Sequence, residues 1–211
     1  MFVKICGITR EEDAQIVVRY GANAMGINLF PGSKRFIPIA RAAPWLKTME
    51  NRIQRVAVVV NPSLEELEAI RSAACFDTIQ FHGDEPPEFC AAAGFAGWIK
   101  ALRVRSGDDL ATADLFSNAR ILLDGWAFGQ YGGTGNRVDW KLAGTFIESH
   151  PDRQVILAGG LTPANVAAAI SKTHPWGVDT AGGVEFEPGI KEEYLVREFI
   201  REARAAGKAT A

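Results

Sequence analysis

The chain has 211 residues, of which 47% are hydrophobic and 23% are charged. This length and composition are typical of one globular domain and exclude a mainly disordered protein. With 23 lysines and arginines against 25 aspartates and glutamates, the formal charge is -2. Such a balance gives no general positive field for nucleic acid or an anionic membrane surface, so it favours a small-molecule partner.

Signals for export or membrane insertion do not stand out in the sequence. The opening MFVKICGITREEDA has no apolar stretch or cleavage site of a signal peptide. The longest apolar runs, such as residues 56–60, are far shorter than the ~20 residues that a transmembrane helix needs. Cys6, Cys75 and Cys90 show no Cys-x-x-Cys spacing, which argues against a disulfide framework or a thiolate zinc site. We therefore expect a cytoplasmic protein that binds no membrane and no nucleic acid.

Short apolar runs rich in valine and isoleucine recur along the chain, and each is bounded by turn-forming residues, as in strands buried on both faces. They cover residues 3–6, 24–29, 55–60, 78–81, 98–102, 120–124, 154–158 and 177–179. Helix signals lie between them. Thr9 precedes an acidic run, and Ser63 with Glu66 forms a capping box. Thr162 is followed by Pro163 at a first helical position.

Alternating strands and helices predict parallel strands with helical crossovers, either in an open doubly wound sheet or in a closed barrel. Eight repeats favour the barrel, although the chain is shorter than the usual length of about 250 residues. We predict an α/β fold, a compact single-domain (β/α)8 TIM barrel over residues 1–211 with eight parallel strands. Residues 203–211 are predicted to be a frayed tail.

In this fold, catalytic groups lie at the C-terminal ends of the strands and in the loops that follow. Those positions are unusually polar or small here. They are Cys6, Asn28, Arg35, Asn61, His82, Arg103, Asp124, Gly159–Gly160, Asp179 and Gly182–Gly183. A purely structural arrangement would place apolar residues at several of them.

Two glycine pairs follow the last two predicted strands, in the segments AGGL at 158–161 and DTAGG at 179–183. Glycine lets backbone N–H groups approach an anion, and these two loops commonly hold phosphate in barrels of this kind. Tight turns are the alternative explanation. The segment GGTG at Gly132–Gly135 has neither the dinucleotide-binding spacing nor the P-loop ending, so we interpret it as a mobile or substrate-covering loop.

Asp124 and Cys6 are candidates for acid and base. Asp124 ends an apolar strand, where partial burial would favour a proton donor, although a helix cap or a salt bridge would also explain it. Cys6 could act as a nucleophile or a base, or be a small buried hydrophobe. Strand alternation places Lys4 and Cys6 on one face, and a buried Lys4 needs a partner, for which Asp179 is the obvious candidate. We hypothesise that Lys4 biases Cys6 toward the thiolate.

Arg35 lies in the segment PGSKRF at 31–36. Its planar guanidinium fork suits a carboxylate, while a solvated surface charge is equally compatible with the sequence.

The order and spacing of several motifs together resemble phosphoribosylanthranilate isomerase from residue 2 to about residue 200. They are VKICGIT at 3–9, SKRFI at 33–37, 56–61, QFHG at 80–83, LLDG at 122–125, GGTG at 132–135, AGGLTPxNV at 158–166 and GVE at 183–185. The first motif and QxHG are quite specific to this family, whereas glycine pairs occur in many phosphate-binding barrels.

The resemblance implies a cofactor-free Amadori rearrangement in tryptophan biosynthesis. It assigns Asp124 as the general acid and Cys6 as the base, with Arg35 binding the anthranilate carboxylate. The phosphate would lie on loops containing Gly159, Gly160, Ala181, Gly182 and Gly183. His82 and Asp179 are further candidates for contact with a phosphoribosyl substrate, and the role of Asp179 stays open. A monomer and a homodimer are both compatible with the sequence.

Two positions depart from the family pattern. Thr180-Ala181-Gly182 replaces a usual Ser-Ser pair, and Lys34 stands where proline often precedes the arginine. Loss of a serine hydroxyl would weaken phosphate binding by about 1 kcal/mol if that bond were made. Two other functions remain as alternatives: a phosphosugar isomerase of the histidine-pathway type, and a silent phosphate-ligand-binding domain.

Overall fold

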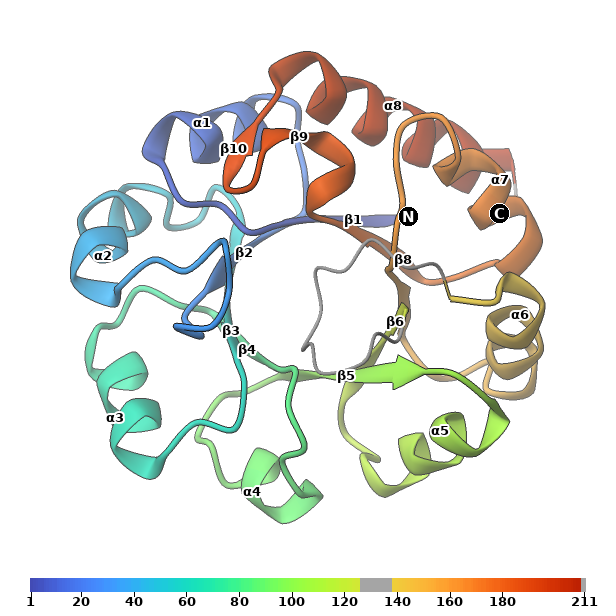
Figure 1. Cartoon of the computed structure of the whole chain (residues 1–211), viewed down its shortest axis with the longest axis horizontal. Helices are drawn as coiled ribbons and strands as arrows, with labels where there is room; N and C mark the ends of the chain where they lie inside the picture. The colour runs from blue at the N-terminus through green and yellow to red at the C-terminus, as the bar shows by residue number, and fades with distance from the viewer. Residues whose placement is uncertain (126–137, 210–211) are drawn as a thin grey trace.

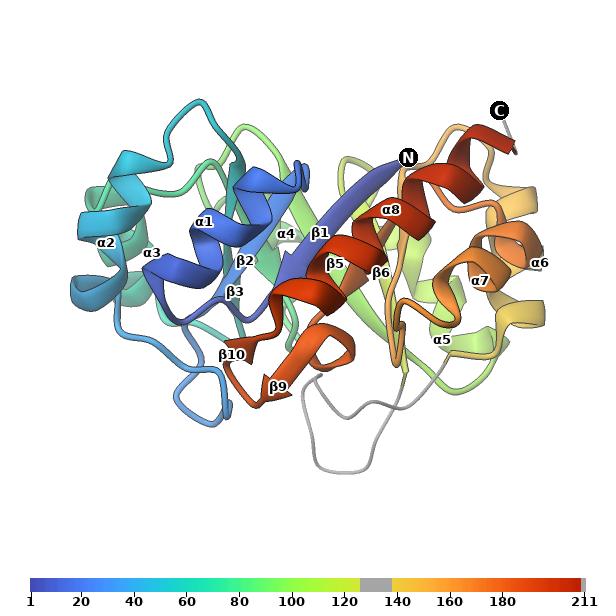
Figure 2. The same cartoon turned by 90° about the horizontal axis from the view of Figure 1, so that it is seen from above.

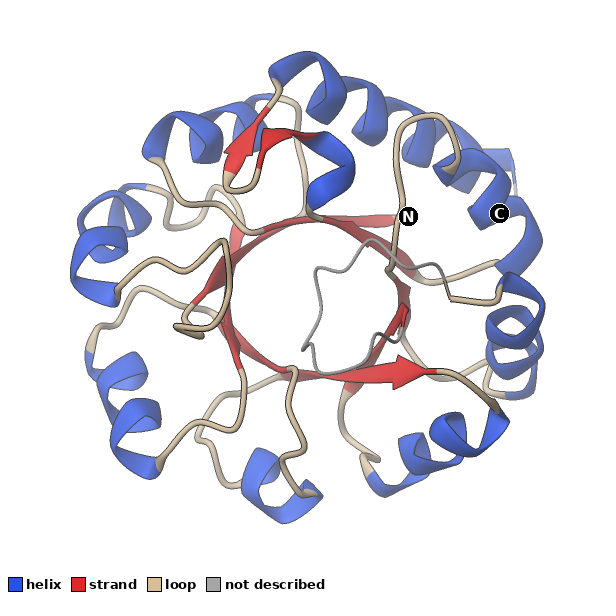
Figure 3. Cartoon of the chain, viewed as in Figure 1, coloured by secondary structure: helices blue, strands red, loops and turns tan. Residues whose placement is uncertain are grey.

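Eight parallel strands form a closed barrel in the computed structural model, which describes residues 1–125 and 138–209. In chain order, each strand pairs with the next and β1 pairs with β8 (Figure 3). The strands are β1 (Phe2–Cys6), β2 (Ala24–Asn28), β3 (Gln54–Val59), β4 (Thr78–Phe81), β5 (Trp98–Val104), β6 (Arg120–Gly125), β7 (Val155–Leu157) and β8 (Gly177–Thr180). The predicted (β/α)8 barrel is confirmed.

Helices surround the barrel in a ring (Figure 1). They are α1 (Glu11–Arg19), α2 (Ile39–Thr48), α3 (Leu64–Ser72), α4 (Pro87–Ala91), α5 (Gly107–Ala111), α6 (Trp140–Ser149), α7 (Val166–Thr173) and α8 (Glu193–Ala209), with short 3-10 turns η1 (Thr112–Leu115) and η2 (Gly182–Val184). Within the described residues, none of these helices combines the length and apolar character needed to cross a bilayer.

Two layers of apolar side chains hold the barrel together. The larger one lies between the strands and the helices and includes Ile5, Ile79 and Phe199, all fully buried. The smaller one fills the barrel interior and includes Val56, Leu122 and other alternate strand residues. Because side chains alternate along a strand, one set of positions packs outward and the next set packs inward. This alternation decides which polar residues can reach the mouth of the barrel.

A hairpin that the sequence analysis did not predict follows the last barrel strand. It consists of β9 (Glu185–Glu187) and β10 (Ile190–Lys191), which pair antiparallel. Figure 2 shows this hairpin on the side of the barrel away from the N-terminus. Since β1 begins at the N-terminus and all eight barrel strands are parallel, the hairpin lies at the carboxyl ends of the strands.

Helix boundaries agree only partly with the sequence signals. The capping box of Ser63 and Glu66 is confirmed, with both reciprocal hydrogen bonds present. The start at Thr9 is wrong, because α1 begins at Glu11 and the Thr9 hydroxyl donates instead to the carbonyl of Gly189, 2.6 Å away. The start near Thr162 is also wrong, since α7 begins at Val166.

The C-terminal segment is ordered further than the sequence suggests. Helix α8 continues through residues 203–209 of the predicted frayed tail, while residues 210–211 lie outside the described part of the chain. Ala203 is fully buried against the barrel core, which ties this part of the helix down. The preceding residues Phe199 and Ile200 are buried in the same cluster.

A bidentate ion pair joins the beginnings of β3 and β4, at the end of the barrel away from the hairpin. Asp77 accepts hydrogen bonds from the Arg55 backbone N–H at 2.7 Å, from Nε at 2.9 Å and from Nη2 at 2.7 Å. Burial alone would raise the pKa of Asp77, but the hydrogen bonds and charge of Arg55 hold this pKa below its usual value.

Replacing this carboxylate in the variant Asp77→Asn should lower the free energy of unfolding by about 1–2 kcal/mol at pH 7, because Arg55 loses a charged partner. A lowered folded-state pKa stabilises the fold above the unfolded-state value of ~3.9, and this contribution is lost as the pH falls through the folded-state pKa. Urea unfolding at pH 7 and pH 3 should show the difference between variant and wild type shrinking in acid. A difference that is equal at both pH values would contradict this assignment.

Candidate active site

Cys6 and Asp124 both face the barrel interior at the carboxyl ends of their strands. Cys6 is the last residue of β1 and packs with the interior apolar cluster. Asp124 lies in β6 two residues after Leu122, a member of the same cluster, so strand alternation directs both side chains inward. The Asp124 residue is only 7% exposed. The thiol and the carboxyl therefore both lie on the inner face of the barrel, at the carboxyl ends of their strands.

Lys4 lies one layer below Cys6 and forms a buried ion pair with Asp179. The Lys4 Nζ is 2.8 Å from Asp179 Oδ1, and the lysine side chain is fully buried. The two residues stand directly opposite each other where β1 pairs with β8. The predicted pairing of Lys4 with Asp179 is confirmed. Asp179 accordingly belongs to the floor of the site.

Gly26 of β2 leaves room for this arrangement. A Cβ atom added at Gly26 would lie 2.6 Å from Cys6 Sγ, closer than such atoms pack, and 3.2 Å from Lys4 Nζ, which is a tight contact. The sulfur and the ammonium therefore lie against the bare backbone of the neighbouring strand.

The charge state of Cys6 differs from the hypothesis drawn from the sequence. Burial raises the pKa of the thiol, and the charge of Asp179 raises it further. Lys4 and Lys191 lower the pKa, but the net direction is upward. Lys4 thus acts in the expected sense without making the thiolate the favoured form. The hypothesised effect of Lys4 is therefore present, but burial together with Asp179 outweighs the two cations.

His82 stands beside Asp124 across the mouth. Its Nε2 atom is 3.3 Å from Asp124 Oδ2, and Asp124 Oδ1 accepts from the Gly125 N–H at 2.9 Å. On its other side, His82 Nδ1 is 3.2 Å from the side-chain nitrogen of Gln80, two residues earlier on β4. When that amide donates to Nδ1, the neutral ring carries its proton on Nε2, an atom that lies near the carboxyl group without a hydrogen bond among the described residues. Gln80 had no role in the sequence analysis, although its spacing from His82 places both on one strand face.

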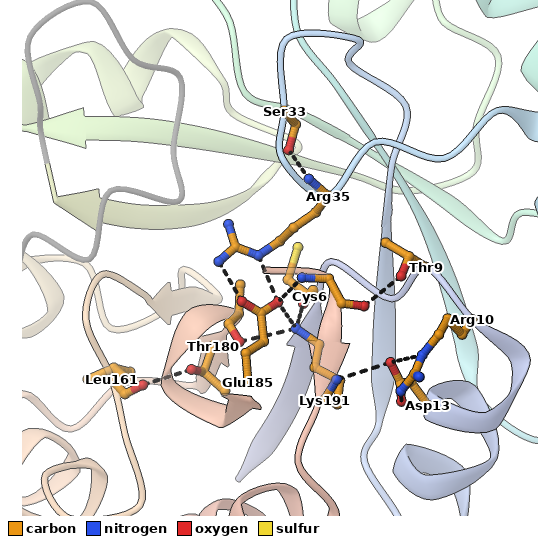
Figure 4. Close-up of polar contacts among 12 residues, drawn as sticks. Cys6, Thr9, Arg10, Asp13, Ser33, Arg35, Leu161, Thr180, Glu185 and Lys191 are labelled. Atoms are coloured by element: carbon orange, nitrogen blue, oxygen red, sulfur yellow. Dashed lines mark hydrogen bonds and ion pairs between the residues drawn. The ribbon is translucent and has the colours of Figure 1, made fainter. Parts of the chain in front are cut away.

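The two glycine loops are joined at the rim. The Thr180 hydroxyl donates to the Leu161 carbonyl at 2.7 Å (Figure 4). Gly183 packs against the same carbonyl. Gly159 and Gly160 have φ values of 81° and 60°, a conformation that side chains rarely adopt. Ala181 and Gly182 follow β8 directly, and η2 begins at Gly182. Glycine at these positions leaves the backbone of both loops free of Cβ atoms that would obstruct an anion.

Arg35 reaches from the segment before α2 to the β9–β10 hairpin. Its Nε and Nη2 atoms donate to the two carboxylate oxygens of Glu185 at 2.8 and 2.7 Å (Figure 4). The arginine side chain is 12% exposed, so a solvated surface charge, the alternative interpretation, is wrong.

Lys191 lies beside Arg35 and Glu185 and contacts the ends of two strands. Its Nζ donates to the Cys6 carbonyl at 2.6 Å, to the Ala181 carbonyl at 3.1 Å and to Glu185 at 2.7 Å. Lys191 and Glu185 were not predicted as site residues. The one feature of the sequence that could have indicated them is their position just after the last glycine loop. The Gly132–Gly135 segment, interpreted as a mobile or covering loop, lies outside the described residues.

Comparisons with known proteins agree with this geometry. Residues 3–202 match the model of the family described as N-(5'-phosphoribosyl)anthranilate (PRA) isomerase. Relatives of that name are 40% identical in Thiobacillus denitrificans, with 97% of this chain and 98% of the relative covered, and 44% identical in Pseudomonas syringae pv. tomato, with 93% and 94% covered.

Solved structures of phosphoribosylanthranilate isomerase are also similar. The Thermotoga maritima structure has a TM-score of 0.87 and 35% identity, covering 97% of this chain and 99% of that one. Another, in complex with reduced 1-(o-carboxyphenylamino)-1-deoxyribulose 5-phosphate, has a TM-score of 0.84 and 34% identity, with the same coverage.

The accessibility and charge of Cys6 give a direct prediction. Cys6 is partly exposed, while Cys75 and Cys90 are buried, so iodoacetamide should modify Cys6 first. Because the pKa of Cys6 is raised, the alkylation rate should reach its midpoint above about pH 8.5. The variant Asp179→Asn should move the midpoint downward, because it removes a negative charge that disfavours the thiolate. A wild-type midpoint below pH 8, measured by mass spectrometry, would contradict this reading.

Proposed function

Because the chain belongs to the phosphoribosylanthranilate isomerase family, we propose that it uses Cys6 and Asp124 as base and acid in the isomerisation of N-(5'-phosphoribosyl)anthranilate. The product is 1-(2-carboxyphenylamino)-1-deoxyribulose 5-phosphate, an intermediate of tryptophan biosynthesis. The observation that carries the assignment is the inward placement of the thiol and the carboxyl on one rim, in a family that performs this rearrangement.

Asp124 carries out the first step in this proposal. Its protonated carboxyl gives a proton to the ring oxygen of the ribose, the bond between that oxygen and C1' breaks, and the nitrogen lone pair forms an iminium. The 7% exposure of Asp124 limits hydration of the group, and His82 lies 3.3 Å from one of its oxygens. His82 would therefore orient the carboxyl toward the substrate and contact the sugar.

Cys6 carries out the second step as a thiolate. It removes the proton from C2', and the electron pair forms the C1'–C2' double bond of an enolamine, which tautomerises to the ketone. The nearby Lys4 and Lys191 offset part of the rise in the pKa of the thiol that burial causes. One carbon of the sugar is reduced while its neighbour is oxidised, so the reaction balances without an outside electron donor or acceptor. We accordingly propose that the enzyme is cofactor-free, an intramolecular aldose–ketose isomerase.

Substrate binding is proposed at the rim loops. Backbone N–H groups of Gly159, Gly160, Ala181, Gly182 and Gly183 would hold the phosphate. Arg35 would bind the anthranilate carboxylate, and Asp179 would act from below through Lys4. The structural neighbour that binds the reduced amino-ketose phosphate supports a ligand with both a phosphate and a carboxyphenyl group.

The cellular setting completes the proposal. A biosynthetic role on a small phosphorylated metabolite fits a cytoplasmic enzyme, and we propose that residues 1–211 act as one domain. We propose that the chain acts as a monomer or a homodimer: the Thermotoga maritima relative is dimeric, and monomers have been generated from it.

Two other functions give different outcomes in an assay. An isomerase acting on the related histidine-pathway phosphosugar is expected to use two carboxylates, and Cys6 in place of one of them disfavours it. Turnover of that substrate, with none of phosphoribosylanthranilate, would favour it instead. A silent phosphate-binding domain would tolerate loss of Cys6.

The variants Cys6→Ala and Asp124→Asn should each lower kcat by about 100- to 10,000-fold, since each removes a proton-transfer group. Affinity for the product should stay close to that of the wild type, because neither residue anchors the phosphate or the carboxylate. Steady-state kinetics together with calorimetric product binding measure both quantities. Unchanged turnover in either variant would remove that residue from the mechanism.

Crowding of the sulfur in the variant Gly26→Ala should lower kcat/KM at least tenfold, because the new Cβ must displace Cys6 Sγ from its position. The variant Gly97→Ala is a matched control, since a Cβ there meets no atom within 4 Å. Its kcat/KM should equal that of the wild type. Equal activity of the two variants would show that the position of the sulfur does not limit catalysis.

A further inference from the structure

Glu185 occupies a central place at the mouth of the barrel that the mechanism does not use. In the β9–β10 hairpin it pairs in register with Lys191, so the hairpin itself holds the two side chains together. The Glu185 side chain is 4% exposed and contacts Arg35 from the other side. Burying a carboxylate this deeply costs free energy even between two cations, so Glu185 is not an ordinary residue of a surface loop.

Both carboxylate oxygens of Glu185 are held. Oε1 accepts from Arg35 Nε at 2.8 Å, from Lys191 Nζ at 2.7 Å and from the Gly189 N–H at 3.2 Å. Oε2 accepts from Arg35 Nη2 at 2.7 Å. Three donors on one oxygen and one on the other fix the plane of the carboxylate. The plane of the carboxylate then fixes the plane of the guanidinium, since the two form a parallel, bidentate pair.

This pairing uses the side edge of Arg35, formed by Nε and Nη2. A guanidinium has five N–H donors, so the outer edge, formed by Nη1 and the second hydrogen of Nη2, remains. Within the described residues, no hydrogen bond or ion pair reaches Nη1. Figure 4 shows one guanidinium nitrogen pointing away from Glu185, while the other two face its carboxylate. The outer edge can therefore accept a second carboxylate in a bidentate manner.

The net charge of the cluster formed by Arg35, Lys191 and Glu185 suits one carboxylate ligand. Arg35 and Lys191 contribute two positive charges and Glu185 one negative charge, which leaves a net charge of one. Burial raises the pKa of Glu185, but Arg35 and Lys191 lower it to below the usual value, so the carboxylate stays ionised at neutral pH. A singly charged carboxylate at the outer edge of Arg35 would neutralise the cluster.

We propose that Glu185 is a positioning residue that holds the guanidinium of Arg35 by its side edge and so presents the outer edge to the carboxylate of the substrate's aromatic ring. Glu185 does not touch the substrate and takes no proton from it. The inference rests on the proposed function, because that function supplies the carboxylate.

A double-mutant cycle tests the proposal. Glu185→Gln should raise KM about tenfold and leave kcat within about twofold, because an amide offers a donor to Nη2 and breaks the bidentate pair. Arg35→Ala should raise KM at least as much. The double variant should match Arg35→Ala alone, since Glu185 acts only through Arg35. Additive increases in KM, or a fall in kcat with unchanged KM, would overturn the proposal.

A substrate analogue that lacks the ring carboxylate, N-(5'-phosphoribosyl)aniline, separates positioning from general damage. With it, wild type and Glu185→Gln should have the same kcat/KM, and a persisting difference would overturn the proposal. Asp77→Asn is the matched control, because it makes the same change on a bidentate Arg55 pair at the far end of the barrel. It should leave KM unchanged.

The experiment distinguishes an error in the proposed function from an error in the role of Glu185. If Glu185→Gln does not fold, Glu185→Asp replaces it in the cycle, because the shorter carboxylate draws Arg35 back and should raise KM in the same way. Absence of any wild-type turnover of phosphoribosylanthranilate would refute the proposed function itself. Wild-type turnover with an unchanged KM in the variants would refute only the role of Glu185.

Discussion

The buried ion pair between Lys4 and Asp179 lies at the seam where the first barrel strand meets the last, and the chemistry of the mouth depends on it. Removing one partner from a buried pair typically costs about 3–5 kcal/mol, because the other charge is left without compensation. The pair places a cation directly beneath Cys6, against the bare backbone of Gly26. It therefore adds a side-chain contact to the backbone pairing of β1 with β8 and also contributes to the electrostatic surroundings of the sulfur.

A second polar cluster connects segments that are distant in sequence. Glu185 and Lys191 of the hairpin hold Arg35 from the segment after β2, the Cys6 carbonyl at the end of β1 and the Ala181 carbonyl after β8. Cys6, Arg35 and the loop after β8 are thus fixed relative to one another through a few buried atoms. Hydrogen bonds to both oxygens of Glu185 and three hydrogen bonds from the Lys191 Nζ offset part of the cost of burying these charges.

The sequence allowed the barrel and the Lys4–Asp179 pair to be predicted, because both follow from local periodicity and from the closure of adjacent strands. Contacts between residues that are far apart in the sequence could not be predicted. The Thr9 hydroxyl has the local signature of a helix cap, yet it bonds to Gly189, 180 residues away. The partner of Arg35 lies 150 residues further along the chain, in a hairpin too short to show a periodic pattern. The lysine that lowers the pKa of Cys6 is visible in the sequence, whereas the depth of burial that raises this pKa is not.

The central claim is that a thiol and a carboxyl face one ligand whose phosphate lies on the last two loops. The most direct measurement is a crystal structure of the chain with the reduced amino-ketose phosphate bound. The account predicts the phosphate on the amides around Gly160 and Gly182, with Cys6 Sγ beside C2' and Asp124 near the oxygen that was in the ring. A phosphate bound elsewhere, or a sulfur turned away from the sugar, would contradict it.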